Sequence, residues 1–157
     1  VAIIDSVKKF NNSKIHNSTK TFQGIRIYVN REISELIYGL INSFKILPIG
    51  GIIAVVTFHS LEDKIVKFFF KYYSQEINNS RYLPEKKKDS KVFKLERAKP
   101  ILPSSEEINK NPPSRSAKLR YGFKIAHLSN FEEFENQFKF FLELENLGIN
   151  LWKSFYL

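Results

Sequence analysis

The residues of this sequence best suited to chemistry stand in a short polar corner that follows an apolar run. The corner reads Phe58-His59-Ser60-Leu61-Glu62-Asp63. An imidazole there can hydrogen-bond a substrate base, or it can tie the loop to the preceding strand as a packed group. His59 is therefore a candidate catalytic residue with a structural alternative. Ser60 and Asp63 have the spacing of a helix capping box, which favours a structural role for both.

A second set of candidates could bind phosphate or RNA. Arg115, Lys118 and Arg120 follow a Pro/Ser-rich segment, and an arginine can grip a phosphate with two hydrogen bonds. Further polar side chains with helical spacing could form one face toward RNA or a cofactor: Thr19, Lys20, Gln23, Arg26 and Asn30. Phe22, Ile25 and Val29 would then form the opposite, core face. For both sets the alternative is an ordinary solvated surface.

The charge distribution favours a polyanionic partner for the middle of the chain. The 157 residues carry a net charge of +9. Residues 81–124 hold thirteen lysines and arginines against five acids, whereas residues 125–157 have a net charge of −3. Phosphate neutralisation scales with the number of cations, although a solvated basic surface would look the same.

Composition also excludes some classes of site. There is no cysteine, so disulfides and thiolate metal sites are excluded, and no metal site is predicted. A hydrophobic fraction of 43% is enough for a folded core. No apolar run is long enough for a membrane span, and no secretory signal is evident, so we expect a cytoplasmic protein without membrane contact.

The first elements that must position these residues are a helix and a buried strand. Apolar spacing predicts a helix over residues 30–47, ended by Pro48 and Gly50-Gly51. The β-branched run over residues 52–57 is typical of a strand buried on both faces in a parallel sheet. We expect it at the centre of a sheet, with one edge left open because no other parallel strand precedes it. A helix should follow from Ser60, with four side chains inward: Ile65, Val66, Phe69 and Tyr73.

The later elements are predicted as two strands and a helix. Residues 74–91 should form an exposed loop, residues 92–96 a strand, and residues 99–116 a connector. From Ala117 apolar and polar residues alternate, which predicts a half-exposed antiparallel strand. Its core face would hold Ala117, Leu119, Tyr121, Phe123 and Ile125, and its exposed face Lys118, Arg120, Gly122 and Lys124. Asn130 should cap a last amphipathic helix that buries Phe131, Phe134, Phe138, Phe141 and Leu142.

Three blocks in this order carry a family resemblance. The first is residues 16–32, HNSTKTFQGIRIYVNRE, and the second is residues 58–67, FHSLEDKIVK. The third, within residues 99–120, includes Lys99-Pro100-Ile101, Asn111-Pro112 and Ser114-Arg115-Ser116-Ala117-Lys118-Leu119-Arg120. Over roughly residues 14–125 the chain resembles the C-terminal half of the ribosomal RNA small-subunit methyltransferase H family, also called MraW.

The resemblance implies an α/β fold: the C-terminal part of a class I, Rossmann-like methyltransferase sheet with an antiparallel last strand, its N-terminal half missing. Residues 1–29 would end a helical insertion for substrate recognition, residues 30–127 would belong to the methyltransferase domain, and residues 128–157 would form a helical tail. The only adjacent glycines, Gly50-Gly51, lack the phosphate-loop pattern. No cofactor-binding residue is therefore assigned to this chain.

The function implied by the resemblance is methyl transfer from S-adenosylmethionine to the N4 amine of a cytosine in the decoding centre of 16S ribosomal RNA. The partner would be the small ribosomal subunit, and the cofactor site would lie mainly in the missing half. This chain alone would then be inactive. The alternatives are a non-catalytic basic RNA-binding domain and an inactive truncated product.

Overall fold

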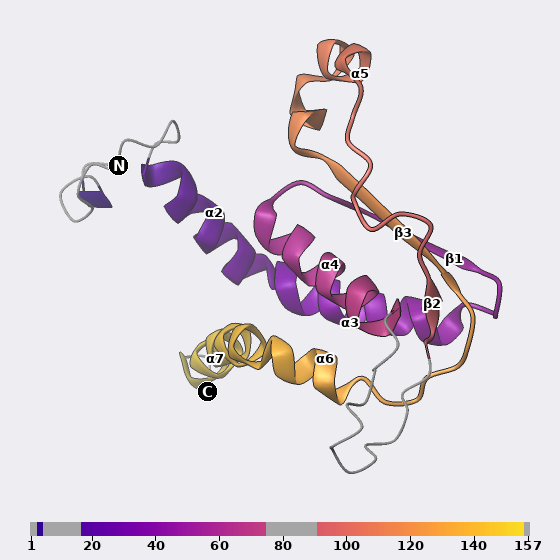
Figure 1. The fold of residues 1–157 in the computed structure, drawn as a ribbon. Coiled ribbons are helices and arrows are strands. Elements are labelled where there is room, and N and C mark those ends of the chain that lie inside the picture. The colour runs from indigo at the N-terminus through magenta and orange to yellow at the C-terminus, as the bar shows by residue number, and fades with distance from the viewer. Residues whose placement is uncertain (1–2, 5–16, 75–90, 156–157) are drawn as a thin grey trace, which may run out of the picture. The chain divides into compact units, whose positions relative to one another are not determined.

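The computed structural model describes residues 3–4, 17–74 and 91–155 (Figure 1). These residues form two compact units, one with the residues up to Leu36 and from Glu135 onward, the other Ile37–Phe134. The predicted loop over residues 74–91 lies almost entirely outside the described residues. The elements, labelled as in Figure 1, are α2 (Asn17–Asn30), α3 (Glu32–Ile46), β1 (Ile52–Thr57), α4 (Ser60–Ser74), β2 (Phe93–Lys94), α5 (Ser105–Lys110), η1 (Pro112–Ser116), β3 (Lys118–Lys124), α6 (Glu132–Gln137) and α7 (Lys139–Phe155).

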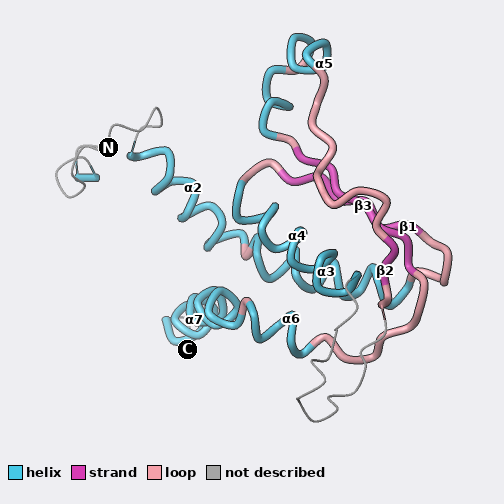
Figure 2. The backbone as a smooth tube through the Cα atoms, in the orientation of Figure 1, coloured by secondary structure: helices cyan, strands magenta, loops and turns pink. Residues whose placement is uncertain are grey.

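The sheet lies in the Ile37–Phe134 unit and has the strand order β1-β3-β2, drawn in magenta in Figure 2. Both pairings are antiparallel, which confirms the predicted antiparallel last strand. The register of β1 on β3 runs from Ile52↔Phe123 to Thr57↔Lys118. No described strand pairs with the other edge of β1. Within the described residues β1 is thus an edge strand, which agrees with the open edge that was expected. Its central position in a larger sheet stays a prediction.

β1 is also buried on one face only. Ile53 and Thr57 are buried, whereas Ile52 and Val56 on the opposite face are 51% and 53% exposed. Helix α4 contacts all three strands, on the side of the sheet that holds the buried residues (Figure 1). The prediction of a strand covered on both faces is therefore wrong for the described residues, because helices of this unit cover only one face.

Strand β3 buries the face that was predicted to be exposed. Lys124 is 1% exposed and Gly122 is buried, while Ile125 of the predicted core face is 42% exposed. Residues paired across two strands share a face of the sheet. One face of the sheet is therefore apolar and only partly covered. We call this the open face, formed by Ile52, Ala54, Val56, Leu119, Tyr121 and Phe123.

The reversal in β3 has a physical cause in the partners of its basic residues. Lys118 and Arg120 bind the Asp63 carboxylate, and the Lys124 ammonium donates to the carbonyls of Phe44 and Leu47 at 2.8 and 2.7 Å. A Cβ at position 122 would lie only 3.0 Å from Phe70, so glycine lets α4 approach the strand. Satisfied charges and a missing side chain make the polar face the better one to cover with a helix.

The core of this unit is built mainly from aromatic rings. Phe69 lies at its centre and is fully buried, with its ring 5.0–5.7 Å from those of four neighbours: Phe70, Tyr73, Phe93 and Phe134. Most of these contacts are edge-to-face, the arrangement that aromatic quadrupoles favour. The predicted inward residues of α4 are all buried, which confirms the helical reading of that segment.

The two N-terminal helices differ in how well their periodicity predicted burial. Helix α3 buries its apolar stripe as expected: Ile33, Ile37, Leu40, Ile41 and Phe44 are each at most 4% exposed. In α2 the predicted core face is wrong, since Phe22, Ile25 and Val29 are 55%, 52% and 70% exposed. The two helices are separated at Arg31, which has a positive φ of 55°.

The predicted last helix is observed as α6 and α7. The Asn130 side chain accepts a hydrogen bond from the Glu132 amide at 2.7 Å, so the predicted cap is confirmed. Phe131, Phe134, Phe138 and Leu142 are buried as expected, whereas Phe141 is only half-buried. From α7 the buried Glu145 carboxylate accepts hydrogen bonds from the amides of Ile33 and Ser34 at 3.2 and 2.9 Å, and from the Ser34 hydroxyl. The tail therefore caps the N-terminus of α3, where the helix dipole favours an anion.

Candidate functional site

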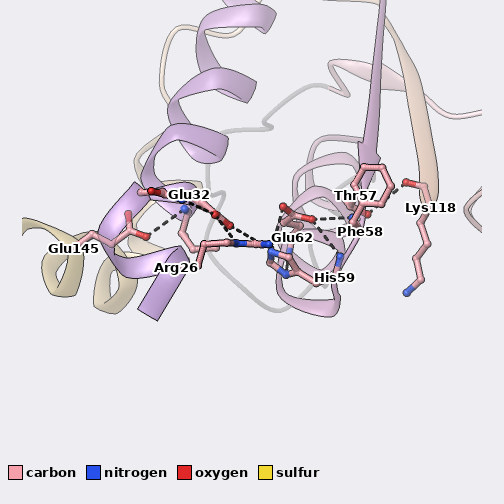
Figure 3. A network of polar contacts seen from close by, with 10 residues as sticks. Arg26, Glu32, Thr57, Phe58, His59, Glu62, Lys118 and Glu145 are labelled. Carbon is pink, nitrogen blue, oxygen red and sulfur yellow. Dashed lines mark hydrogen bonds and ion pairs between the residues drawn. The ribbon is translucent and has the colours of Figure 1, made fainter. Parts of the chain in front are cut away.

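The corner between β1 and α4 is organised by a reciprocal cap (Figure 3). The Glu62 amide donates to Nδ1 of His59 at 3.3 Å, and the Glu62 carboxylate accepts from the amides of Phe58 and His59 at 2.8 and 3.2 Å. Nε2 of His59 lies 3.2 Å from the other carboxylate oxygen of Glu62, and the imidazole is only 10% exposed. The predicted box of Ser60 and Asp63 is thus wrong by one position. His59 itself acts as the cap, and Glu62 is the acid three residues later.

Asp63 does not take part in the cap and instead forms ion pairs with two basic residues of β3. Its carboxylate lies 2.8 Å from Nε of Arg120 and 3.0 Å from Nζ of Lys118, and its side chain is 13% exposed. Burial acts to raise the pKa of Asp63, but the hydrogen bonds and charges of Arg120 and Lys118 outweigh it and hold the pKa below its usual range. The three side chains form a charge cluster that joins the start of α4 to β3.

The three predicted phosphate-binding cations therefore have different surroundings. Arg120 is 10% exposed, and it also donates to the Ala98 carbonyl at 3.1 Å. Lys118 is 37% exposed and shares Asp63. Arg115 is exposed in η1, next to the buried Ser114. Arg115 thus presents its charge to solvent, whereas much of the charge of the other two is compensated within the protein.

The predicted polar face of α2 also divides into two groups. Arg26 pairs with Glu32 through Nε at 2.8 Å, and the Asn30 amide donates to the same carboxylate at 3.2 Å. Both contacts brace the junction of α2 and α3, and the pair of Arg26 and Glu32 is drawn in Figure 3. Thr19 and Lys20 are exposed and Gln23 is half-buried, so this part of the face is the more accessible to a partner.

The glycine pair in the α3–β1 connection has a structural role. Gly50 has a φ of 87°, and its amide donates to the Lys124 carbonyl at 2.8 Å. A Cβ at Gly51 would lie 2.5 Å from the Leu47 side chain. Both glycines thus serve a tight turn that enters β1. The fold thus explains this glycine pair, and the pair assigns no cofactor site to the described residues.

A group of cations that the sequence reasoning missed surrounds a cavity of about 410 Å³ beside β3. It includes Lys67 and Lys71 of α4 and Arg97 and Lys99 of the following connector. The i, i+4 spacing of the two lysines was a signal for a shared helix face. Their meeting with the connector could not be read from spacing, because it depends on how that connector returns to the sheet.

Comparison with known proteins places these blocks in a family. The model of the MraW methylase family matches residues 1–125, most of the chain. The chain belongs to the MraW methylase family. The match includes all three blocks quoted above, which confirms the resemblance they carry. It ends before α6 and α7, so the segment that caps α3 lies outside the family match.

Curated relatives named Ribosomal RNA small subunit methyltransferase H show the same relationship. The protein from Chelativorans sp. (strain BNC1) is 46% identical over 122 residues, which are 78% of this chain and 36% of the relative. That from Bartonella grahamii is 50% identical over 133 residues, 76% of this chain and 40% of the relative. That from Methylorubrum extorquens (strain PA1) is 51% identical over 112 residues, which are 70% of this chain and 32% of the relative. The chain thus spans about a third to two fifths of these relatives' length.

No helix among the described residues combines the length and the apolar character that crossing a membrane requires.

Proposed function

We propose that this chain is part of an S-adenosylmethionine-dependent methyltransferase that modifies the N4 amine of a cytosine in the decoding centre of small-subunit ribosomal RNA. The observation that carries the proposal is the family match over residues 1–125, together with relatives of 46–51% identity that are named Ribosomal RNA small subunit methyltransferase H. The proposed partner is the small ribosomal subunit, and the proposed location is the cytoplasm.

The sheet supports the further proposal that another part of the protein, N-terminal to these elements, completes the site. β1 offers an edge to which no described strand pairs, and the open face exposes Ile52 and Val56 by about half. An uncovered sheet edge and an apolar face both favour additional strands and helices, as in sheets covered on both sides. We assign S-adenosylmethionine to that other part, where it would supply the methyl group.

The role proposed for this chain is to shape the crevice and to hold RNA. Methylation of an amine demands alignment of its lone pair on the methyl carbon more than acid–base catalysis. In open α/β sheets ligands bind beyond the carboxyl ends of strands, and His59 follows β1 at that end. We therefore propose that His59 positions the RNA substrate. Arg115, Lys20 and Thr19 remain the accessible candidates for backbone contacts.

The activity can be tested by complementation. The portion of the Chelativorans relative that this chain does not match would be joined to it and supplied with labelled S-adenosylmethionine and small ribosomal subunits. We expect label in RNA, recovered as N4-methylcytidine by mass spectrometry of nucleosides. Label in another nucleoside would contradict the proposed specificity, and its absence from a folded fusion would contradict the proposed activity.

The role of His59 can be separated from its capping function by one conservative variant. Asparagine is a good helix cap, so His59→Asn should preserve α4 and its stability. If His59 positions the RNA, this variant loses methyl transfer while remaining folded. If it retains full activity, His59 acts only as the cap of α4.

The alternative, a basic RNA-binding domain without catalysis, is favoured by one observation, the excess of cations in residues 81–124. It predicts RNA binding with a steep dependence on salt, because neutralised phosphates release counterions. RNA binding of that kind, together with no methyl transfer by the folded fusion, would favour this alternative. An inactive truncated product would show neither.

A further inference from the structure

The cavity beside β3 exists because the connector after β2 leaves the sheet and returns. β2 pairs with β3 as far as Lys94↔Phe123, and the chain rejoins the same edge at Ile101↔Leu119. Between these two points the connector is not paired with β3. The resulting cavity of about 410 Å³ lies between the connector, the second half of α4 and β3. We call it the connector pocket; its size is within the usual range for small-ligand sites.

The rim of the connector pocket is strongly basic. Lys67, Lys71, Arg97 and Lys99 line it, and all four side chains are exposed. None of them forms an ion pair with a described residue. No described carboxylate lines the pocket, since the nearby Glu96 accepts a hydrogen bond from the Tyr121 hydroxyl at 2.8 Å outside the lining. Four uncompensated cations around one cavity favour an anionic ligand.

We call the lining residues Phe70, Leu95 and Arg120 the floor of the pocket. Tyr121 also lines the pocket, but its pairing with Ala54 places its side chain on the open face. The Arg120 guanidinium is held in place by Asp63 at 2.8 Å and by the Ala98 carbonyl at 3.1 Å. A nucleobase can stack on aromatic rings or on an arginine plane, and this binding tolerates different bases.

We propose that the connector pocket binds a phosphorylated nucleoside, with the base on the floor and the phosphate between Lys67, Lys71 and Lys99. The ligand chemistry could come from a free nucleotide or from one unpaired residue of an RNA strand. The RNA source rests on the proposed function, and the surplus of cations in residues 81–124 supports it. The pocket uses the second half of α4, whereas His59 and Asp63 lie in its first turn or before it.

The experiment measures binding to the 157-residue chain by titration calorimetry. The probes are cytidine 5′-monophosphate, cytidine, inorganic phosphate and a short single-stranded RNA. Lys71→Ala with Lys99→Ala removes two rim charges. The matched control, Lys110→Ala with Lys139→Ala, removes the same charge from two exposed helical residues that do not line the pocket. Circular dichroism checks that both double variants remain folded.

We expect the nucleotide to bind more tightly than cytidine or phosphate, because it uses both rim and floor. The rim variant should weaken nucleotide binding about tenfold or more, equivalent to about 1.4 kcal/mol, while the control stays within about twofold. Equal losses in the two variants, or no nucleotide binding by the unmodified chain, would overturn the proposal. If the rim variant binds the nucleotide more weakly but binds RNA unchanged, the natural ligand is a free nucleotide, and RNA as its source is overturned.

The floor has its own test. Leu95→Ala should weaken binding of the nucleotide and leave binding of inorganic phosphate unchanged. If both fall equally, the base does not lie on the floor and the assigned ligand class is wrong.

The test of the connector pocket can fail or succeed independently of the test of the proposed methyl transfer. In the fusion described above, the rim variant should raise KM for RNA and leave kcat unchanged. An unchanged KM for RNA in an active fusion would overturn RNA as the source of the ligand, but it would not contradict the methyltransferase. Nucleotide binding that depends on the rim in a protein without methyl transfer would contradict the methyltransferase but not the pocket.

Discussion

Two charged residues among those described, Lys124 and Glu145, are buried and a third, Asp63, is half-buried; each is satisfied by specific partners. Asp63 binds two cations, Lys124 binds two carbonyls at the end of α3, and Glu145 binds the amides at its start. Removing one partner of such a group leaves the other without compensation in a poorly solvated place. These residues therefore offer the sharpest single-residue tests of the structure.

Asp63→Asn should lower the free energy of unfolding by about 2–4 kcal/mol at neutral pH, because Arg120 and Lys118 lose their shared anion. The depressed pKa of Asp63 also predicts a pH effect. Its contribution is present above the unfolded-state pKa of 3.8 and is lost as the pH falls below that value through the folded-state pKa. Urea unfolding at a series of pH values measures both effects.

The control for this variant is Glu106→Gln, which alters an exposed i, i+4 pair with Lys110. Exposed pairs contribute about 0–1 kcal/mol, so little change is expected. If Asp63→Asn were no more destabilising than this control, the assigned cluster of Asp63, Lys118 and Arg120 would be wrong.

Lys124→Met should destabilise the protein by about 2–4 kcal/mol, although it replaces a lysine with an apolar side chain of similar length. The Nζ atom donates to two carbonyls and lies 4.3 Å from the centre of the Phe44 ring. Lys94→Met, at an exposed position of β2, is the matched control. A neutral effect at position 124 would mean that its ammonium is solvated, as the alternation of β3 alone predicts.

At the scale of elements, α3 is fastened by residues far from it in sequence. Glu145 of α7 caps its N-terminus, and Lys124 of β3 caps its C-terminus. The helix dipole favours an anion at the N-terminus and a cation at the C-terminus, so both caps stabilise α3. The helix that precedes β1 is thus held at both ends, and one of the caps comes from outside the family match.

Glu145→Ala should cost about 1–3 kcal/mol, because two amides and the Ser34 hydroxyl lose their acceptor. Hydrogen exchange should report the loss locally, with faster exchange at the amides of Ile33 and Ser34 than in α4. Glu143→Ala, an exposed neighbour on the same helix, is the control. Unchanged protection of the α3 amides in Glu145→Ala would contradict the cap.

At the scale of the whole molecule, the open face distinguishes this chain from a sheet covered on both sides. Its residues are apolar by type, yet Ile52 and Val56 are half-exposed while Ile53 between them is buried. An apolar face of this kind favours a covering layer. The proposed methyltransferase would supply that layer from its other part.

Val56→Asp should therefore change the stability of the 157-residue chain by only about 1 kcal/mol, whereas Ile53→Asp should cost more than about 3 kcal/mol. In the active fusion, Val56→Asp should in addition reduce methyl transfer, because its carboxylate would be buried under the covering layer. Thermal unfolding and the methylation assay measure the two effects. Equal destabilisation of the chain by both variants would contradict an open face.

The sequence by itself determined the local elements and the family. Helices α3 and α4 were predicted from the spacing of apolar residues, and strand β1 from a continuous run of β-branched residues. Both signals are local in the chain. The three blocks carried the family because their residue types and order are unusual together. The Asn130 cap was also predictable, since a cap involves neighbours in sequence.

Tertiary structure decided which side of β3 is buried and where the cations meet. Alternation shows that a strand has two faces, but Asp63 lies 55 residues from Lys118 and 57 from Arg120, and only folding brings that anion beneath the basic face. The connector pocket likewise depends on a chain that leaves β3 after Lys94 and returns at Ile101. Periodicity encodes a difference between faces, whereas burial of a charge depends on distant partners that compensate it.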